Sequence, residues 1–100
     1  MNFVYKEKDV PTMVLEFDGT WEGIANVLGV ESVDYKTIDN RVTIVGDSEN
    51  INGFLDGTKK DLKVAFVAHE NNRGFDEMTV EEIRNVGQLI RSKISKFIKR

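Results

Sequence analysis

The sequence contains no cysteine, one histidine and one proline among its 100 residues. Without cysteine, disulfide bonds, thiolate catalysis, cysteine-ligated zinc and iron–sulfur clusters are excluded. A single histidine excludes a metal site with two histidine ligands. No apolar run approaches the roughly 20 residues of a membrane-spanning helix, and no cationic start followed by an apolar core marks a signal peptide. We therefore expect no cofactor, no membrane association and a cytoplasmic location.

Sequence motifs that bind phosphate or calcium are also missing. Neither G-x-x-x-x-G-K-[ST] nor G-x-G-x-x-G occurs in the chain. The stretch that begins at Ser48 has part of the spacing of a calcium loop, but its twelfth position is Lys59, where the ion requires a bidentate acid. The sequence predicts no metal site.

Charged residues are plentiful, and they are divided unevenly along the chain. Residues 1–75 carry 13 acids and 8 bases, whereas residues 76–100 carry 4 acids and 6 bases. The last ten residues contain no acid and these five bases: Arg91, Lys93, Lys96, Lys99 and Arg100. Cations at the end of a helix oppose its dipole, which is one explanation of this cluster. Contact with an acidic partner is the other.

The first half of the chain predicts a strand, a helix and a hairpin. Period-two alternation over residues 13–17 predicts a strand, while residues 2–9 suit a terminal strand or a loosely ordered arm. Thr20 and Gly29 bracket a short helix as its N-cap and its C-terminal stop. Residues 32–38 and 41–45 predict a hairpin with an Asp39-Asn40 turn, in which Tyr35 lies opposite Ile44. In that register the buried face holds Val33, Tyr35, Val42 and Ile44, and the wet face holds Asp34, Lys36, Arg41 and Thr43.

The second half predicts a buried strand and a long helix. Residues 62–68 are almost wholly apolar, as in a central strand buried on both faces, and residues 69–76 suit a polar loop. Thr79 and Glu82 form a capping box, with Met78 and Ile83 as its hydrophobic staple. We expect the helix to run to about Ile98, with an apolar stripe of Ile83, Val86, Ile90, Ile94 and Phe97, and with Ile83 and Ile90 facing the sheet.

This order of elements predicts an α+β fold for residues 1–100 as one domain. We expect a mostly antiparallel, four-stranded sheet packed against a long C-terminal helix. A ferredoxin-like split βαβ sandwich is one arrangement that fits this order. A plain antiparallel meander on the long helix is the other.

One loop holds candidates for a catalytic site. His69, Glu70 and Arg73 follow the central strand, and sites tend to lie on loops at strand ends. His69 would act as a general base, Glu70 would orient it, and Arg73 would hold an anion. The alternative is that a polar loop here simply carries the central strand into solvent.

Candidate binding residues lie at the last helix and at the only tryptophan. Phe97 and Ile98 sit where a helix of about 30 Å outruns strands of about 17–20 Å, so we expect a partner to cover them. Arg91, Lys93 and Lys96 would then meet acids at the rim of that contact. Trp21 is either an interface anchor or a core residue at a helix start.

The chain resembles the start of certain small bacteriophage and prophage proteins. The resemblance lies in Val-Pro-Thr-Met-Val-Leu-Glu-Phe-Asp-Gly at residues 10–19 and in the helix that ends Asn26-Val27-Leu28-Gly29. Those proteins begin with a proline-led strand, an aromatic-Asp-Gly turn and a short helix. Here the proline-to-glycine spacing is shorter and their later Pro-Gly-Asp-Tyr segment is missing. The resemblance carries over no catalytic residue and implies a phage or mobile-element accessory protein.

The absence of catalytic motifs, together with the long amphipathic helix, favours a small non-enzymatic intracellular binding protein. It would act by protein–protein contact, with another protein or with a second copy of itself as a homodimer. A second hypothesis is a protein or enzyme that binds a nucleotide or phosphorylated metabolite at the His69–Arg73 loop. A third is weak nucleic-acid binding through Lys59, Lys60, Lys63 and the basic helix end, which the net charge of −3 opposes.

Overall fold

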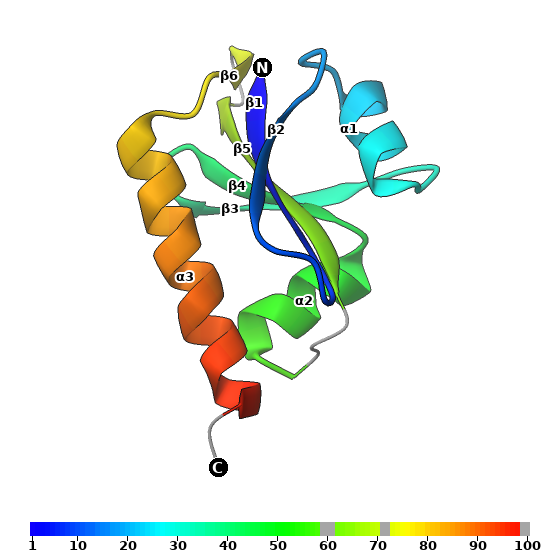
Figure 1. Cartoon of the computed structure of the whole chain (residues 1–100). Helices are drawn as coiled ribbons and strands as arrows, with labels where there is room; N and C mark the ends of the chain where they lie inside the picture. The colour runs from blue at the N-terminus through cyan, green and yellow to red at the C-terminus, as the bar shows by residue number, and fades with distance from the viewer. Residues whose placement is uncertain (59–61, 71–72, 99–100) are drawn as a thin grey trace.

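Six strands and three helices occupy the part of the chain that the computed structural model describes, which is residues 1–58, 62–70 and 73–98, with side chains up to Lys93 (Figure 1). The strands are Asn2–Glu7 (β1), Met13–Glu16 (β2), Asp34–Asp39 (β3), Val42–Gly46 (β4), Lys63–Glu70 (β5) and Gly74–Asp76 (β6). The helices are Trp21–Leu28 (α1), Ser48–Asp56 (α2) and Val80–Ile98 (α3). This is the α+β class that the sequence predicts.

The sheet is centred on β5. Its strands follow the order β2-β1-β5-β4-β3 with antiparallel neighbours, and β6 pairs with the end of β5. Every residue of β5 from Val64 to His69 is buried. The apolar run at residues 62–68 thus forms a central strand buried on both faces, as predicted.

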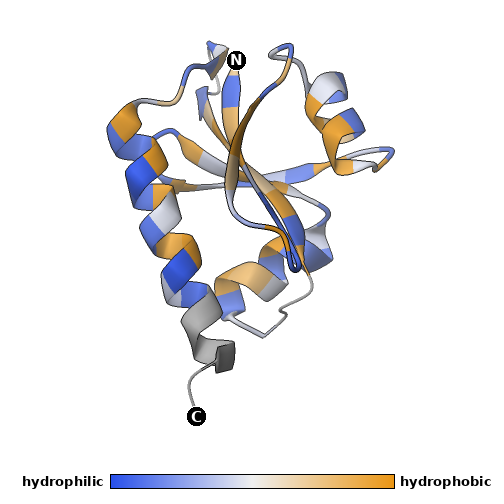
Figure 2. Cartoon of the chain, in the orientation of Figure 1, coloured by the Kyte–Doolittle hydropathy of each residue, from blue (hydrophilic) through white to orange (hydrophobic). Residues whose placement is uncertain are grey.

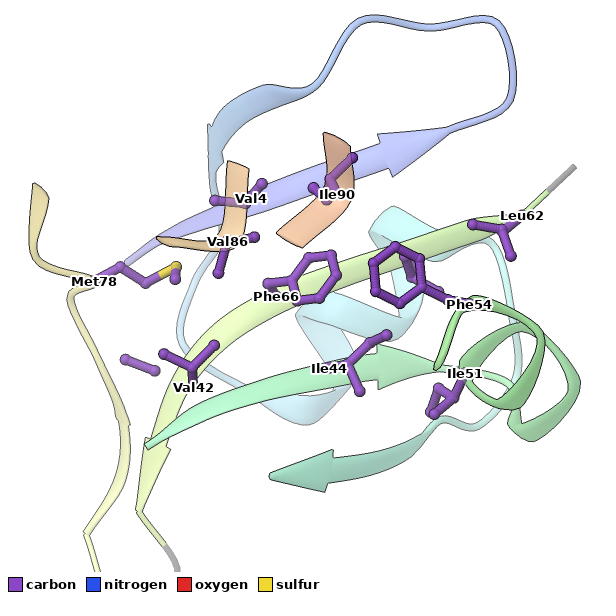
Figure 3. Close-up of a cluster of buried hydrophobic side chains, with 12 residues drawn as sticks. Val4, Val42, Ile44, Ile51, Phe54, Leu62, Phe66, Met78, Val86 and Ile90 are labelled. Carbon is purple, nitrogen blue, oxygen red and sulfur yellow. The ribbon is translucent and has the colours of Figure 1, made fainter. Parts of the chain in front are cut away.

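Helices cover both faces of this sheet (Figure 1). Alternate residues of β5 point to opposite sides, so Phe66 packs with α2 and α3 while Val67 packs with α1. Figure 3 shows the first of these cores, in which the rings of Phe54 and Phe66 lie 5.4 Å apart, below Val86 and Ile90 of α3. Figure 2 shows the hydrophobic residues of α3 interleaved with hydrophilic ones, as one buried stripe requires.

Helix α1 begins and ends where the sequence predicts. The Gly23 N–H donates to Thr20 Oγ1 at 2.9 Å, and Gly29 adopts the left-handed conformation with φ of 71°. Position 23, inside this short helix, requires glycine for a steric reason. Asp18 Oδ1 accepts from the N–H and the hydroxyl of Thr20, and a Cβ at Gly23 would fall on that carboxylate.

Helix α3 carries the predicted capping box. The Thr79 N–H donates to Glu82 Oε1 at 2.8 Å, and the Glu82 N–H donates to Thr79 Oγ1 at 3.1 Å. Ile90 is buried against the sheet, and Ile83 packs on the same cluster, as expected. The stripe continues at Ile94 and Phe97, whose side chains lie outside the described residues. No helix in the described ranges has the length and apolarity to cross a bilayer.

The strand count differs from the four predicted. Residues 2–7 form β1, the first of the two alternatives for this segment, because β1 is buried between β2 and β5. Residues 74–76, placed in a polar loop, form β6, and His69 and Glu70 belong to β5. The ferredoxin-like arrangement is not confirmed, since β2 lies at the sheet edge beyond β1 and β5 lies beside β4.

The predicted hairpin forms, but its register is shifted by one residue. Tyr35 lies opposite Val45 and not Ile44, and the pairing is irregular between Thr37 and Asp39. Tyr35 is consequently 48% exposed, whereas Thr43 is fully buried. The prediction of one wet face was wrong because β4 lies between β3 and β5 with core on both sides.

Arg41 joins three segments that are distant in sequence. Its Nε and Nη2 donate to the two carboxylate oxygens of Glu82 at 2.9 and 3.0 Å, and its Nη1 donates to Asp76 Oδ2 at 2.8 Å. Nη2 also donates to the Glu77 carbonyl at 2.8 Å. Only 22% of this side chain is exposed, so its placement on a wet face was wrong. The β3–β4 turn, β6 and the start of α3 are held by one guanidinium.

Burial of the α3 stripe predicts a large effect of truncation. We expect Ile90→Ala to lower the free energy of unfolding by about 2–5 kcal/mol, because it leaves a cavity against the sheet. The control is Val80→Ala on the same helix, where the side chain is 73% exposed and the change should stay within about 0.5 kcal/mol. Urea unfolding followed by circular dichroism measures both. Equal effects would contradict the packing described for Ile90.

The Arg41 contacts predict a stability that depends on pH. Hydrogen bonds from Arg41 lower the pKa of Glu82. The pKa of Asp76 is lowered mainly by the hydrogen bond from the Glu77 N–H and, to a smaller extent, by the hydrogen bond from Arg41. Carboxylates with lowered pKa values stabilise the fold fully above their unfolded pKa of about 4, and this contribution disappears as pH falls through the folded pKa.

We therefore expect Arg41→Met to destabilise the protein by about 1 kcal/mol at pH 7, and by less at pH 3. Thermal midpoints at the two pH values measure this, with the exposed Arg84→Met as the control. A difference between wild type and Arg41→Met that is the same at both pH values would refute the assignment.

Candidate functional site

An aromatic cluster lies where α1, β3, β5 and β6 meet. It comprises Trp21, Tyr35, His69 and Phe75. The Trp21 ring centroid lies 4.9 Å from Tyr35, 5.0 Å from His69 and 4.7 Å from Phe75. His69 lies a further 5.0 Å from Phe75 and 5.5 Å from Tyr35. Two candidates from the sequence, Trp21 and His69, are therefore neighbours in space.

Local structure explains how three of the four rings, those of Trp21, His69 and Phe75, reach this cluster. Trp21 is the first residue of α1, directly after the Thr20 cap that Asp18 holds in place. His69 follows Val67 by two residues on β5, so both face the α1 side of the sheet. Phe75 lies directly opposite His69 in the β5–β6 pairing. Three separate pairing and capping events thus position the rings.

The imidazole of His69 is enclosed. The residue is 8% exposed, and its Nδ1 is buried without a hydrogen-bond partner in the described part of the chain. Rings of Trp21, Tyr35 and Phe75 lie on three sides of it. Its main-chain N–H donates to the Arg41 carbonyl at 2.9 Å, which fixes the strand. At this position the His69 ring makes edge-type contacts with the rings of both Trp21 and Tyr35.

Beside the cluster the surface opens into a groove of about 660 Å³ between α1 and the segment that leads into β3. We call it the aromatic groove. Trp21 and Tyr35 form one part of its wall, Val30 and Val33 another, and the exposed carboxylates of Glu22 and Glu31 stand at its rim. Neither carboxylate has an ion-pair partner among the described residues.

This combination of groups suits a cation. The faces of tryptophan and tyrosine attract ammonium and guanidinium groups, and carboxylates within the same groove complete the charge balance. Tyr35 is nearly half exposed and stacks at 34° to Trp21, so both rings are accessible from the groove. A lysine or arginine side chain with its apolar stem fits such a surface.

The three residues of the predicted catalytic loop are divided. Glu70 Oε2 lies 3.6 Å from Arg73 Nη1 at the β5–β6 connection, while His69 enters the aromatic cluster. Adjacent residues on a strand point to opposite faces, so the pairing of His69 with the Glu70 carboxylate is not seen in the described structure. In that structure no cluster of three His, Asp or Glu side chains suits a metal ion.

The predicted binding residues on α3 have different surroundings. Arg91 is exposed. Lys93 Nζ donates to the Leu55 carbonyl at 2.7 Å, one of the last carbonyls of α2 that lack a partner within the helix. The side chains of Lys96, Phe97 and Ile98 lie outside the described residues.

Two members of the cluster, Tyr35 and Phe75, could not be assigned to it from the sequence pattern. Tyr35 was predicted to be buried, because alternation alone cannot place a strand whose pairing shifts by one residue. Phe75 was assigned to a loop, because β6 is a strand of three residues. The one feature of the sequence that could have indicated the groove is the presence of Glu22 and Glu31 near the only tryptophan. Glu31 comes close to Trp21 only because the chain turns back after α1.

No family model, no curated protein and no solved structure matches this chain. The case for a function therefore depends on the chain's own residues, and above all on the aromatic groove.

Proposed function

We propose that this protein is a non-enzymatic binding protein that acts by protein–protein contact, and that the aromatic groove receives a basic segment of its partner. The observation that carries the proposal is the pair of the half-exposed Tyr35 and the partly buried Trp21, with Glu22 and Glu31 at the rim of the groove. Tryptophan, tyrosine and arginine dominate the energetics of protein interfaces, and cation–π contact joins these residue types.

Charge in the rest of the chain supports the same partner. Residues 1–75 hold 13 acids against 8 bases, so the surface around the groove attracts cations over distances longer than a contact. The same carboxylates repel phosphate, which disfavours a nucleic acid in this groove. A basic peptide segment would pair with the carboxylates at the groove and would also be attracted by the excess of acids in residues 1–75.

The position of His69 supports binding over catalysis. A general base must reach the proton it removes, directly or through one water. The His69 imidazole lies behind Trp21, Tyr35 and Phe75, and 8% of the residue is exposed. Its contribution is a rigid support that keeps the two groove rings in place, which lowers the entropic cost of binding.

The proposal can be tested with a short peptide of alternating arginine and glycine. Trp21 is the only tryptophan, so its intrinsic fluorescence reports occupancy of the groove. We expect saturable binding at low salt that weakens as salt rises, because exposed charges are screened. A peptide of alternating glutamate and glycine should not bind.

Variants locate the contact. We expect Tyr35→Ala and Glu31→Lys each to weaken binding on the order of fivefold, since a cation–π or charge contact is removed. Asp56→Lys makes the same change of charge on an exposed residue of α2 outside the groove and should leave affinity within about twofold. Equal weakening by Asp56→Lys and Glu31→Lys, or equal binding of the acidic peptide, would refute the proposal.

A further inference from the structure

A second groove lies on the other side of the sheet, between α3, the edge strand β3 and the end of α2. Its volume is about 650 Å³, within the range of small-molecule sites. The apolar part of its lining is formed by Ile38, Val42, Leu55, Val86 and Leu89. We call it the α3 groove.

The groove exists because α3 does not extend over β3. Val86 and Ile90 pack on the central strands, and Ile38 is the one residue of β3 that packs against that core. Two residues earlier the inward position holds Lys36, which lies opposite Ile44 in the β3–β4 pairing. The Lys36 residue is exposed and does not fill the space above the edge strand, so Ile38, Leu55 and Leu89 stay only partly buried at the groove.

Two lysines line the groove, Lys36 from β3 and Lys93 from α3. Lys93 Nζ donates to the Leu55 carbonyl, and Leu55 itself lines the groove. Lys36 has no ion-pair or hydrogen-bond partner among the described residues. An ammonium group has three donors, so Lys93 keeps two beyond the one that Leu55 uses.

We propose that the α3 groove binds an amphipathic carboxylate, with its apolar body on the partly buried Ile38, Leu55 and Leu89 and its carboxylate between Lys36 and Lys93. The charged residues determine which way round the ligand lies in the groove. Asp39 also lines the groove, three residues along β3 from Lys36 and so about 10 Å away. A carboxylate is attracted to the lysine end and repelled from the Asp39 end.

A small ligand fits this groove better than a strand of another protein. Strand addition needs a regular edge, whereas β3 carries charged residues and an irregularity between Thr37 and Asp39. Charges and bulges on an edge strand oppose pairing with another chain. The groove instead offers one apolar surface and one cationic end, which is the pattern of a site for a single amphiphile.

Isothermal titration calorimetry with decanoate, below its micelle concentration, tests this proposal. Decylamine has the same chain with the opposite charge, and decanol has no charge. We expect decanoate to bind at least about tenfold more tightly than either, because charge-assisted hydrogen bonds to Lys36 and Lys93 are lost with the other two ligands.

Lys36→Glu is the decisive variant, because Lys36 is exposed and Lys93 also satisfies a carbonyl of α2. It should weaken decanoate binding by about tenfold or more with an unchanged thermal midpoint. Lys8→Glu changes the charge equally on an exposed residue outside the groove and should leave affinity unchanged.

Equal affinities for decanoate and decylamine would overturn the proposal, as would equal effects of the two variants. Binding of an acidic amphipathic peptide without binding of decanoate would overturn it in favour of a protein partner. Binding of the arginine peptide at the aromatic groove should be unaffected by Lys36→Glu, so the outcomes at the two grooves are independent.

Discussion

Burial of β5 on both faces is the constraint on which the other elements depend. A strand with apolar side chains on both sides must be covered twice, so one helix on one face is insufficient. The chain meets this requirement with α2 and α3 on the Phe66 side and α1 on the Val67 side. Three helices do not cover every strand of so wide a sheet, and the two edge strands, β2 and β3, are left largely exposed, β3 the more so.

Both grooves are products of that incomplete cover. On one side of β3, α1 leaves Tyr35 accessible beside Trp21, and the rim is acidic. On the other side, α3 leaves Ile38 and Leu55 partly accessible beside Leu89, and Lys36 and Lys93 also line the groove. The same edge strand therefore contributes to two surfaces of opposite charge character. Under the two proposals, a ligand of one charge is disfavoured in the other groove.

Elements fixed by local chemistry were predictable from the sequence. Three features need only neighbouring residues to be recognised: the caps of α1 at Thr20 and Gly29, the capping box of Thr79 and Glu82, and the almost wholly apolar run that forms most of β5. Features fixed by pairing were not. The register of Tyr35 depends on an irregularity that no turn signal reveals, and the separation of His69 from Glu70 depends on β5 extending past residue 68. The candidate site was predictable in part. Trp21 and His69 could be recognised as candidates from the sequence, but their contact arises from long-range packing, which a local pattern does not reveal.

The insertion of β1 between β2 and β5 has a consequence for how the protein forms. Val4 pairs with Val14 on one side and with Phe66 on the other, so one neighbour is local and the other is about sixty residues away. During synthesis the β1–β2 hairpin can pair early, but a two-stranded hairpin alone is at best marginally stable in water. The central strand of the sheet, β5, can pair with β1 only after it has been synthesised. The entropic cost of closing so long a loop between β1 and β5 slows folding. Until then the second edge of β1 is unpaired, and this is the stage at which the chain is most exposed to association with other unfolded chains.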